Sequence, residues 1–164
     1  MLRFTHLDKN KFEMQSQSIF AILAGNMSRI APTGNTYEND YKSWFEAVDR
    51  GLAEKSRQMI LICFADTLIG FFQYYVNNEL FMMEEIQIVS QWQGKQIFRK
   101  LHGFIFTNLP DDIKIVEAYA NKQNQKSQGI LQKLGLENIG ENKNGNCYHY
   151  RGTFQNLLNW YQNY

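Results

Sequence analysis

The chain has 164 residues and a formal net charge of +1, and 44% of its residues are hydrophobic, 15% aromatic and 20% charged. A chain of this size and composition can bury a core without disulfides or metal, which excludes a disordered protein and a small disulfide scaffold. The near-zero charge excludes the basic surface that attracts nucleic acids and anionic membranes, so we expect neither as a partner.

The sequence predicts neither export, nor a membrane span, nor a metal centre. Residues 1–6 lack an apolar signal core, and no stretch approaches the roughly 18 apolar residues of a spanning helix. The two cysteines, Cys63 and Cys147, form no CxxC or Cys/His ligand spacing, and Cys63 stands in an apolar run that favours a buried free thiol. We therefore expect a cytoplasmic protein with one domain over residues 1–164 and no metal.

The N-terminal half is predicted to contain a strand, two helices and a meander. A short strand is expected over 2–7, and apolar residues recur at helical spacing over 11–30 and 38–52. The period then changes to runs rich in Ile, Phe, Tyr and Val, separated by turn residues. These runs predict a three-stranded antiparallel meander. Its strands are expected over 58–65, 68–76 and 80–89.

The C-terminal half is predicted to alternate helices and strands. Its elements are a helix over 94–108, a strand over 113–120, a helix over 124–134, a hairpin with strands 137–140 and 148–152, and a terminal helix over 154–161 in an extension spanning 153–164. Gly135 suits the residue after the second of these helices. The resulting order, β-α-α-β-β-β-α-β-α-β-β, predicts a mixed α/β fold with an antiparallel centre and one parallel crossover.

Two segments carry a family resemblance. Residues 86–98 read IQIVSQWQGKQIF, and residues 124–136 read NQKSQGILQKLGL. The first resembles the fourth strand and acyl-CoA signature, Q/R-x-x-G-x-G/A, of the GNAT family of N-acetyltransferases. The second resembles the N-x-x-A-x-x-L-Y-E-K-L-G-F segment of that family, and the order of predicted elements matches it over nearly the whole chain. The resemblance implies a largely antiparallel twisted sheet flanked by helices, with strands four and five splayed apart.

The resemblance also implies a site for acetyl-CoA. A helix expected to begin near Gln93 would offer unpaired N–H groups and a positive dipole end to the pyrophosphate. Gln93 matches the first signature position, whereas Gln96 and Phe98 replace small residues; starting the signature at Gln91 is the less favoured register. An ordinary strand–loop–helix junction is the alternative interpretation. The residues of this expected turn are Gln93, Gly94, Lys95, Gln96, Ile97 and Phe98.

The pantetheine arm is expected, by the same resemblance, to lie between strands four and five. Backbone groups of Ile86, Ile88 and Val89 would pair with its amides as an added strand does. Asn124 would bind the arm from the other side, although Asn is also a favoured helix N-cap. Ser127 replaces the alanine of the family and is included among the expected cofactor-binding residues.

The candidate catalytic residues are Glu84 and Glu85, which lie in the strand run 80–89. Strand side chains alternate, so the two acids point to opposite faces, and either could accept the proton of an amine. Glu84 matches the family position that often carries the base, and the alternative is a carboxylate at a solvated strand edge or one paired with Lys or Arg. The oxyanion donor is expected to be a backbone N–H near Ile88.

The tyrosine that the family often uses as general acid is replaced by Leu131. Tyr119, Tyr148 and Tyr150 are conceivable substitutes, although packing is the more ordinary role for each. No role is assigned to the three histidines.

The sequence therefore predicts an acetyl-CoA-dependent N-acetyltransferase. The acceptor is an amine of a small molecule or peptide that attacks the thioester directly, and the protein is a monomer or homodimer. Gln96, Phe98 and Leu131 favour the alternative, a catalytically degenerate GNAT-like domain that acts as a protein-interaction or ligand-binding module.

Overall fold

The computed structural model describes residues 1–163, and its strands and main helices follow the predicted order. The sequence did not predict the two short 3-10 helices, η1 and η2. In chain order the elements are β1 (Leu2–His6), η1 (Lys9–Lys11), α1 (Phe12–Ile30), α2 (Tyr37–Ala53), β2 (Gln58–Phe64), β3 (Thr67–Asn77), β4 (Leu80–Ile88), η2 (Ser90–Trp92), α3 (Ile97–Phe106), β5 (Ile115–Asn121), α4 (Gln125–Lys133), β6 (Glu137–Glu141), β7 (Cys147–Thr153) and α5 (Phe154–Asn163).

The seven strands form one mixed sheet in the order β1-β2-β3-β4-β5-β7-β6. β1 pairs antiparallel with β2, β2 with β3, β5 with β7 and β6 with β7, whereas β4 and β5 are parallel. The predicted mixed α/β class, with a largely antiparallel sheet and one parallel crossover, is therefore confirmed. The parallel register runs from Leu80↔Ile115 to Met83↔Ala118, and both strands continue beyond it.

The chain divides into two compact units. Unit 1 comprises Met1–Tyr75 and Glu85–Lys95, and unit 2 comprises Val76–Glu84 and Gln96–Tyr164. A single domain over residues 1–164 stays a prediction, and residue 164 lies outside the described residues.

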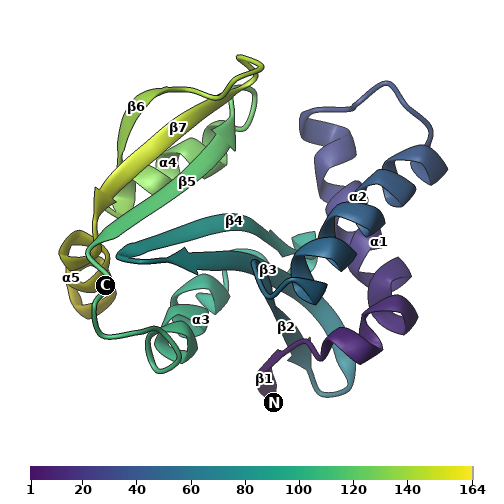
Figure 1. Cartoon of the computed structure of the whole chain (residues 1–164), viewed down its shortest axis with the longest axis horizontal. Coiled ribbons are helices and arrows are strands. Elements are labelled where there is room, and N and C mark those ends of the chain that lie inside the picture. The colour runs from purple at the N-terminus through teal and green to yellow at the C-terminus, as the bar shows by residue number, and fades with distance from the viewer. Residues whose placement is uncertain (164) are drawn as a thin grey trace. The chain divides into compact units, whose positions relative to one another are not determined.

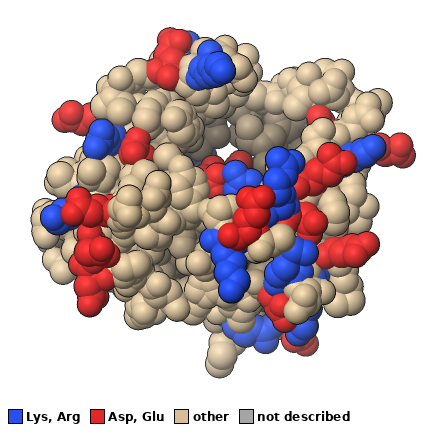
Figure 2. Space-filling view, viewed as in Figure 1, with Lys and Arg blue, Asp and Glu red and all other residues tan. Residues whose placement is uncertain are grey.

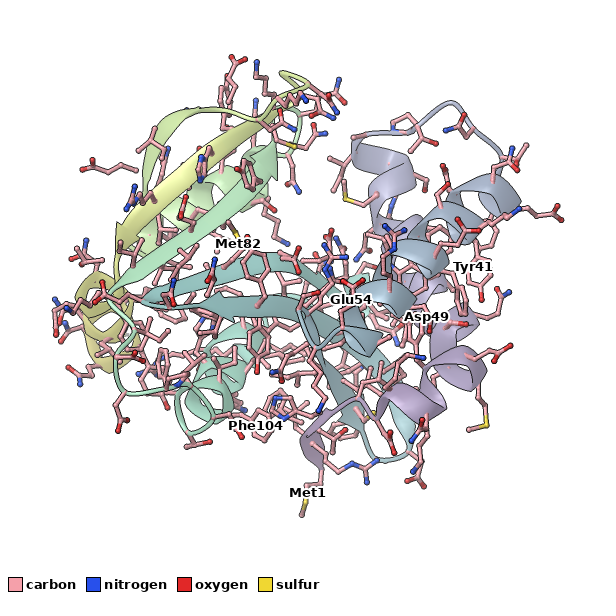
Figure 3. All side chains as sticks on the ribbon, viewed as in Figure 1. Met1, Tyr41, Asp49, Glu54, Met82 and Phe104 are labelled. Atoms are coloured by element: carbon pink, nitrogen blue, oxygen red, sulfur yellow. The ribbon has the colours of Figure 1, made fainter. Side chains whose placement is uncertain are left out.

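In unit 1, α1 and α2 pack against each other and against the sheet (Figure 1). Phe12 of α1 is fully buried and stacks on Phe45 of α2, with ring centroids 5.2 Å apart. Burial of such aromatic side chains is a main source of folding free energy. Two polar residues of α1, Ser16 and Asn26, occupy buried positions on the same stripe. Ser16 shares a 2.7 Å hydrogen bond with the hydroxyl of Tyr41, which is labelled on α2 in Figure 3.

In unit 2, α4 packs against β5, and α5 packs against β7, β5 and α3 (Figure 1). Leu131 and Leu134 of α4 are buried, as is Tyr150 of β7. The predicted terminal helix over 154–161 is confirmed as α5, while residue 164 of the predicted extension lies outside the described part.

The surface of the described chain carries mixed charge. Figure 2 shows acidic and basic side chains interspersed over the face in view, most densely over the helices of unit 1. Within residues 1–163, no helix combines the length and the apolar character needed to cross a bilayer.

Candidate active site

The junction between β4 and α3 differs from the predicted one. Ser90–Trp92 form a 3-10 turn, Gln93 is extended, and α3 begins only at Ile97. The expected helix start near Gln93 is therefore wrong, as is the helical assignment of residues 94–96. Gly94 has φ 75° and Gln96 has φ 61°, and two left-handed residues so close together are incompatible with a continuous right-handed helix.

Gln96 stands in the signature position where glycine is expected, and its backbone explains that preference. With φ 61° and ψ 19° it adopts the left-handed conformation that glycine tolerates best. This backbone conformation is not helical. The chain instead keeps the glycine-type turn with an exposed glutamine, and Lys100 N–H donates to the Gln96 carbonyl at 3.1 Å as α3 begins.

The second departure from the signature, Phe98, packs inside unit 2. Its ring centroid lies 4.5 Å from that of His102 and 5.7 Å from that of Trp160 on α5. The Phe98 side chain is therefore occupied by packing within unit 2. The first N–H groups of α3, from Ile97 onward, have no partner within the helix by geometry. A Cβ built on Gly94 would meet nothing within 4 Å, so the turn is open at this residue.

In unit 1, the C-terminal end of β4 is held by side-chain amides. Asn26 Nδ2 donates to the Ile88 carbonyl at 3.0 Å and to Gln87 Oε1 at 2.9 Å. Gln93 Nε2 donates to the same Ile88 carbonyl at 2.8 Å. That oxygen has two lone pairs and now accepts two hydrogen bonds, so pairing of the Ile88 carbonyl with a pantetheine amide is not supported.

The backbone N–H groups of Val89 and Ile88 point to opposite edges of β4. Val89 N–H donates to the Ile69 carbonyl of β3 at 2.8 Å, so its donor is already used inside the sheet. The N–H and C=O of one strand residue point to the same edge, so the Ile88 N–H lies with its carbonyl on the edge away from β3. This geometry suits the predicted oxyanion donor near Ile88.

Glu84 and Glu85 are both partly buried on β4, two and three residues after Met82, which is labelled in Figure 3. Gln87 Nε2 donates to Glu85 Oε1 at 2.5 Å, which shows that Glu85 and Gln87 share a face of the strand. Glu84 points to the other face by strand alternation. Glu85 is thereby linked through Gln87 to Asn26 of α1.

On the unit 2 side, Asn124 is the N-cap of α4, and its Oδ1 accepts from Ser127 N–H at 3.1 Å. The alternative of an ordinary cap is therefore realised, and the Nδ2 group is the part of Asn124 that could still donate to pantetheine. Leu131 is 8% exposed. Gln128 Nε2 holds the end of β5 by donating to the Asn121 and Lys122 carbonyls, each at 3.0 Å.

The tyrosines considered as general acids have distinct surroundings within unit 2. Tyr119 is 43% exposed and stacks on His149 at 4.4 Å, and His149 Nε2 is hydrogen-bonded to the Glu117 carboxylate. Tyr148 lies under the Lys122 ammonium, and Tyr150 is buried. Among residues 1–163 no three His, Cys, Asp or Glu side chains gather into a metal site.

The fold is found in solved N-acetyltransferases. An acetyltransferase from Thermus thermophilus superposes with a TM-score of 0.72 at 13% identity, covering 94% of this chain and 97% of that one. The PaiA N-acetyltransferase from Thermoplasma acidophilum, in complex with coenzyme A, gives 0.68 at 12% identity with 94% and 99% coverage. Spermidine N-acetyltransferase from Vibrio cholerae, with CoA and spermine, gives 0.64 at 13% identity with 96% and 98% coverage. The chain has the GNAT fold.

The likeness to the GNAT fold lies in the structure rather than in the sequence. No protein-family model matches the chain, and no curated protein sequence matches it. The signature segment illustrates this, since Gln96 stands where the signature has glycine.

Sequence reasoning missed Asn26, Gln87 and the Glu117–His149 pair. A signal for Asn26 exists, because it follows Ile19 by seven residues and Leu23 by three, which places a polar residue on the apolar stripe of α1. Nothing in the spacing indicates that Glu117 and His149 meet, because their contact depends on the register of β5 with β7 in the GNAT fold.

Proposed function

We propose that the chain is an acetyl-CoA-dependent N-acetyltransferase that acts on the amine of a small molecule or peptide. The observation that carries the proposal is the left-handed turn at Gln96, which follows β4 and η2 and leads into α3 within a GNAT fold. Holding glutamine in this conformation costs on the order of 1 kcal/mol, and such strain is typical of functional turns. The phosphates of the co-substrate would lie against the N–H groups at the start of α3.

The proposed cofactor-binding residues divide into two groups with separate tasks. The pyrophosphate is assigned to residues of the turn, and the pantetheine arm to backbone groups of β4 and to Asn124, with Ser127 beside it on α4. Ile86 is the proposed partner of the arm on β4. Ile88 is left out because its carbonyl already accepts two hydrogen bonds and its N–H is the proposed oxyanion donor, and Val89 contributes less because its N–H is bonded to β3. The turn residues are Gln93, Gly94, Lys95, Gln96, Ile97 and Phe98.

The reaction requires a base and an oxyanion donor from this chain. The acceptor nitrogen attacks the thioester carbon, its proton passes to a carboxylate of β4, and the carbon–sulfur bond breaks to release CoA. Glu84 and Glu85 are the proposed bases, acting directly or through one water. The Ile88 N–H is the proposed donor to the oxyanion, and the thiolate takes its proton from water because Leu131 carries none.

The test is turnover with defined amines. Spermine is the first probe, because it lies in the Vibrio cholerae neighbour, followed by spermidine, kanamycin and a peptide with a free N-terminus. CoA release and acetylated product are measured together by chromatography. Acetylation of at least one amine supports the proposal, and removal of the true base should lower kcat on the order of a hundredfold or more.

The degenerate module remains the second candidate, favoured by Gln96 and Leu131. It predicts that no amine in the panel is acetylated even when acetyl-CoA binds. That outcome would replace the enzymatic proposal with a ligand-binding one.

A further inference from the structure

A chain of buried side-chain amides in unit 1 leads from the backbone of β4 to the carboxylate of Glu85. Asn26 Nδ2 donates to the Ile88 carbonyl and to Gln87 Oε1, at 3.0 and 2.9 Å, and Gln87 Nε2 donates to Glu85 Oε1 at 2.5 Å. Asn26 is 9% exposed and Gln87 is 8% exposed, so both amides are shielded from solvent. We call this chain of hydrogen bonds, Ile88–Asn26–Gln87–Glu85, the amide relay.

The orientation of each amide in the relay follows from the one before it. A backbone carbonyl only accepts hydrogen bonds, so Asn26 must turn its NH2 group toward Ile88. The same NH2 group supplies the second bond, which requires Gln87 to present its oxygen to Asn26 and its own NH2 group to Glu85. Rotating either amide by half a turn would place two donors or two acceptors together in a buried site, which is disfavoured because both groups would lose their partners.

The relay ends in a donor, and a donor favours the ionised form of the carboxyl group that accepts from it. A carboxylate accepts hydrogen bonds at both oxygens, whereas a neutral carboxyl group must place a proton on one of them. A glutamate side chain also has several rotamers, and a base is effective only when it is held within hydrogen-bond reach of its target. The relay meets both requirements at Glu85.

The relay is also tied to the turn that follows β4. Gln93 Nε2 donates to the same Ile88 carbonyl at 2.8 Å, so this oxygen joins Asn26 of α1 to the first signature residue. A shift of α1 would therefore disturb both Glu85 and the turn.

We propose that Asn26 and Gln87 are positioning residues that hold the Glu85 carboxylate as the base of acyl transfer. The inference rests on the proposed function and deepens it, because it selects Glu85 over Glu84 and assigns a catalytic task to a residue of α1. Asn26 and Gln87 act through Glu85 and do not touch the reacting atoms.

The first test removes each amide while keeping the side-chain volume close to the original. Gln87→Met and Asn26→Leu should lower kcat with the best amine of the panel by about tenfold to a hundredfold, because small misplacements of a catalytic group have effects of this size. For Gln87→Met, which leaves the Ile88 carbonyl bonded to Asn26 and Gln93, the Kd for acetyl-CoA measured by calorimetry should stay within about twofold. Ser16→Ala is the matched control, since Ser16 is a buried polar residue of α1 that bonds to α2 instead of β4.

The second test separates positioning from a general structural role. In a Glu85→Gln background, Gln87→Met should lower kcat no further, because residues that act through one group are not additive. A merely structural amide would lower kcat by the same factor with Glu85 present or absent. Equal factors in the two backgrounds would overturn the assignment.

A third measurement does not depend on turnover. The side-chain NH2 signals of Asn26 and Gln87 are followed by nitrogen-15 NMR, and slow hydrogen exchange of both is expected in the unchanged chain. Glu85→Ala should speed the exchange of Gln87 and leave Asn26 protected by the Ile88 carbonyl. Fast exchange of both amides in the unchanged chain would overturn the relay itself.

Failure of the proposed function and failure of the inference about the amide relay give different results. Slow amide exchange without acetylation of any amine contradicts the proposed function and the catalytic task of the relay, while the hydrogen bonds stand. Acetylation by the unchanged chain, with Gln87→Met and Asn26→Leu equally active, contradicts the inference alone.

Discussion

His102 makes the stability of the protein dependent on pH. The imidazole is fully buried on α3, and Nδ1 lies 2.8 Å from the Phe98 carbonyl, so Nδ1 carries the hydrogen. Burial lowers the pKa of His102 from 6.5 to about 4, and the hydrogen bond to Phe98 offsets part of that effect. The folded chain therefore holds His102 neutral at pH values where the unfolded chain has already bound a proton.

The difference between the folded and unfolded pKa of His102 sets the sign and size of the change in the free energy of unfolding with pH. Because the folded pKa lies below the unfolded one, stability is fully present above about pH 6.5 and is lost as the pH falls toward about 4. A shift of this size corresponds to about 3 kcal/mol in total, of which about 2 kcal/mol is lost by about pH 5. Loss of about 2 kcal/mol lowers Tm by roughly 4–8 °C in a chain of this length.

The assay compares the unchanged chain with His102→Leu. Urea unfolding at about pH 7.5 and about pH 5 gives the free energy of unfolding at each pH for each protein. His102→Leu removes the bond to Phe98, which costs about 1 kcal/mol at the higher pH. The decrease between the two pH values should, however, be smaller by about 2 kcal/mol in the variant. An equal decrease in both proteins would exclude His102 as the source, because the other titrating groups are common to the two.

Three further predictions concern the turn, the sheet and the cap. Gln96→Gly should raise stability by about 1 kcal/mol in thermal unfolding by relieving the left-handed backbone, and an unchanged or lower Tm would argue against this strain. Gly70→Ala should destabilise the chain by about 1–3 kcal/mol, since its Cβ would lie 2.6 Å from the Gln87 carbonyl. Gly129→Ala, which meets nothing within 4 Å, should be neutral or stabilising as its control. Asn124→Asp should keep the cap of α4 and its Tm but weaken acetyl-CoA binding in calorimetry, and equal affinity would remove Asn124 from the cofactor site.

Much of the fold was predictable because hydrophobic period and turn residues act locally. The alternation in 58–65, 68–76 and 80–89 marks three strands, and the stripe over 11–30 marks α1. The start of α3 was not predictable in the same way. Left-handed geometry at a glutamine is imposed by the surrounding structure, and no local propensity indicates it.

The candidate site was predictable only in part. The segment around Gln93 and the N-cap at Asn124 follow from motif and capping rules, and the acids of β4 follow from their place in an apolar strand. The amide relay could not be predicted from the sequence, because the contact of Asn26 with Gln87 joins residues 61 positions apart. A polar residue on an apolar helix stripe predicts a buried hydrogen-bond partner, but the sequence does not identify that partner.

The packing of Phe98 shows why a sequence departure can mislead. A bulky residue in a small-residue signature suggests a blocked site. Its ring is instead part of the aromatic cluster with His102 and Trp160, which α5 completes. The direction of one side chain decides whether the substitution matters, and that direction is a property of tertiary packing.

The proposed activity depends on co-substrate binding at the turn between β4 and α3, and calorimetric titration of the full chain with acetyl-CoA measures that binding. We expect saturable binding at one site per chain, together with a Tm that rises with acetyl-CoA concentration by mass action. If titration with millimolar acetyl-CoA gives no heat of binding and no rise in Tm, the turn holds no co-substrate. The chain is then not an acetyl-CoA-dependent enzyme.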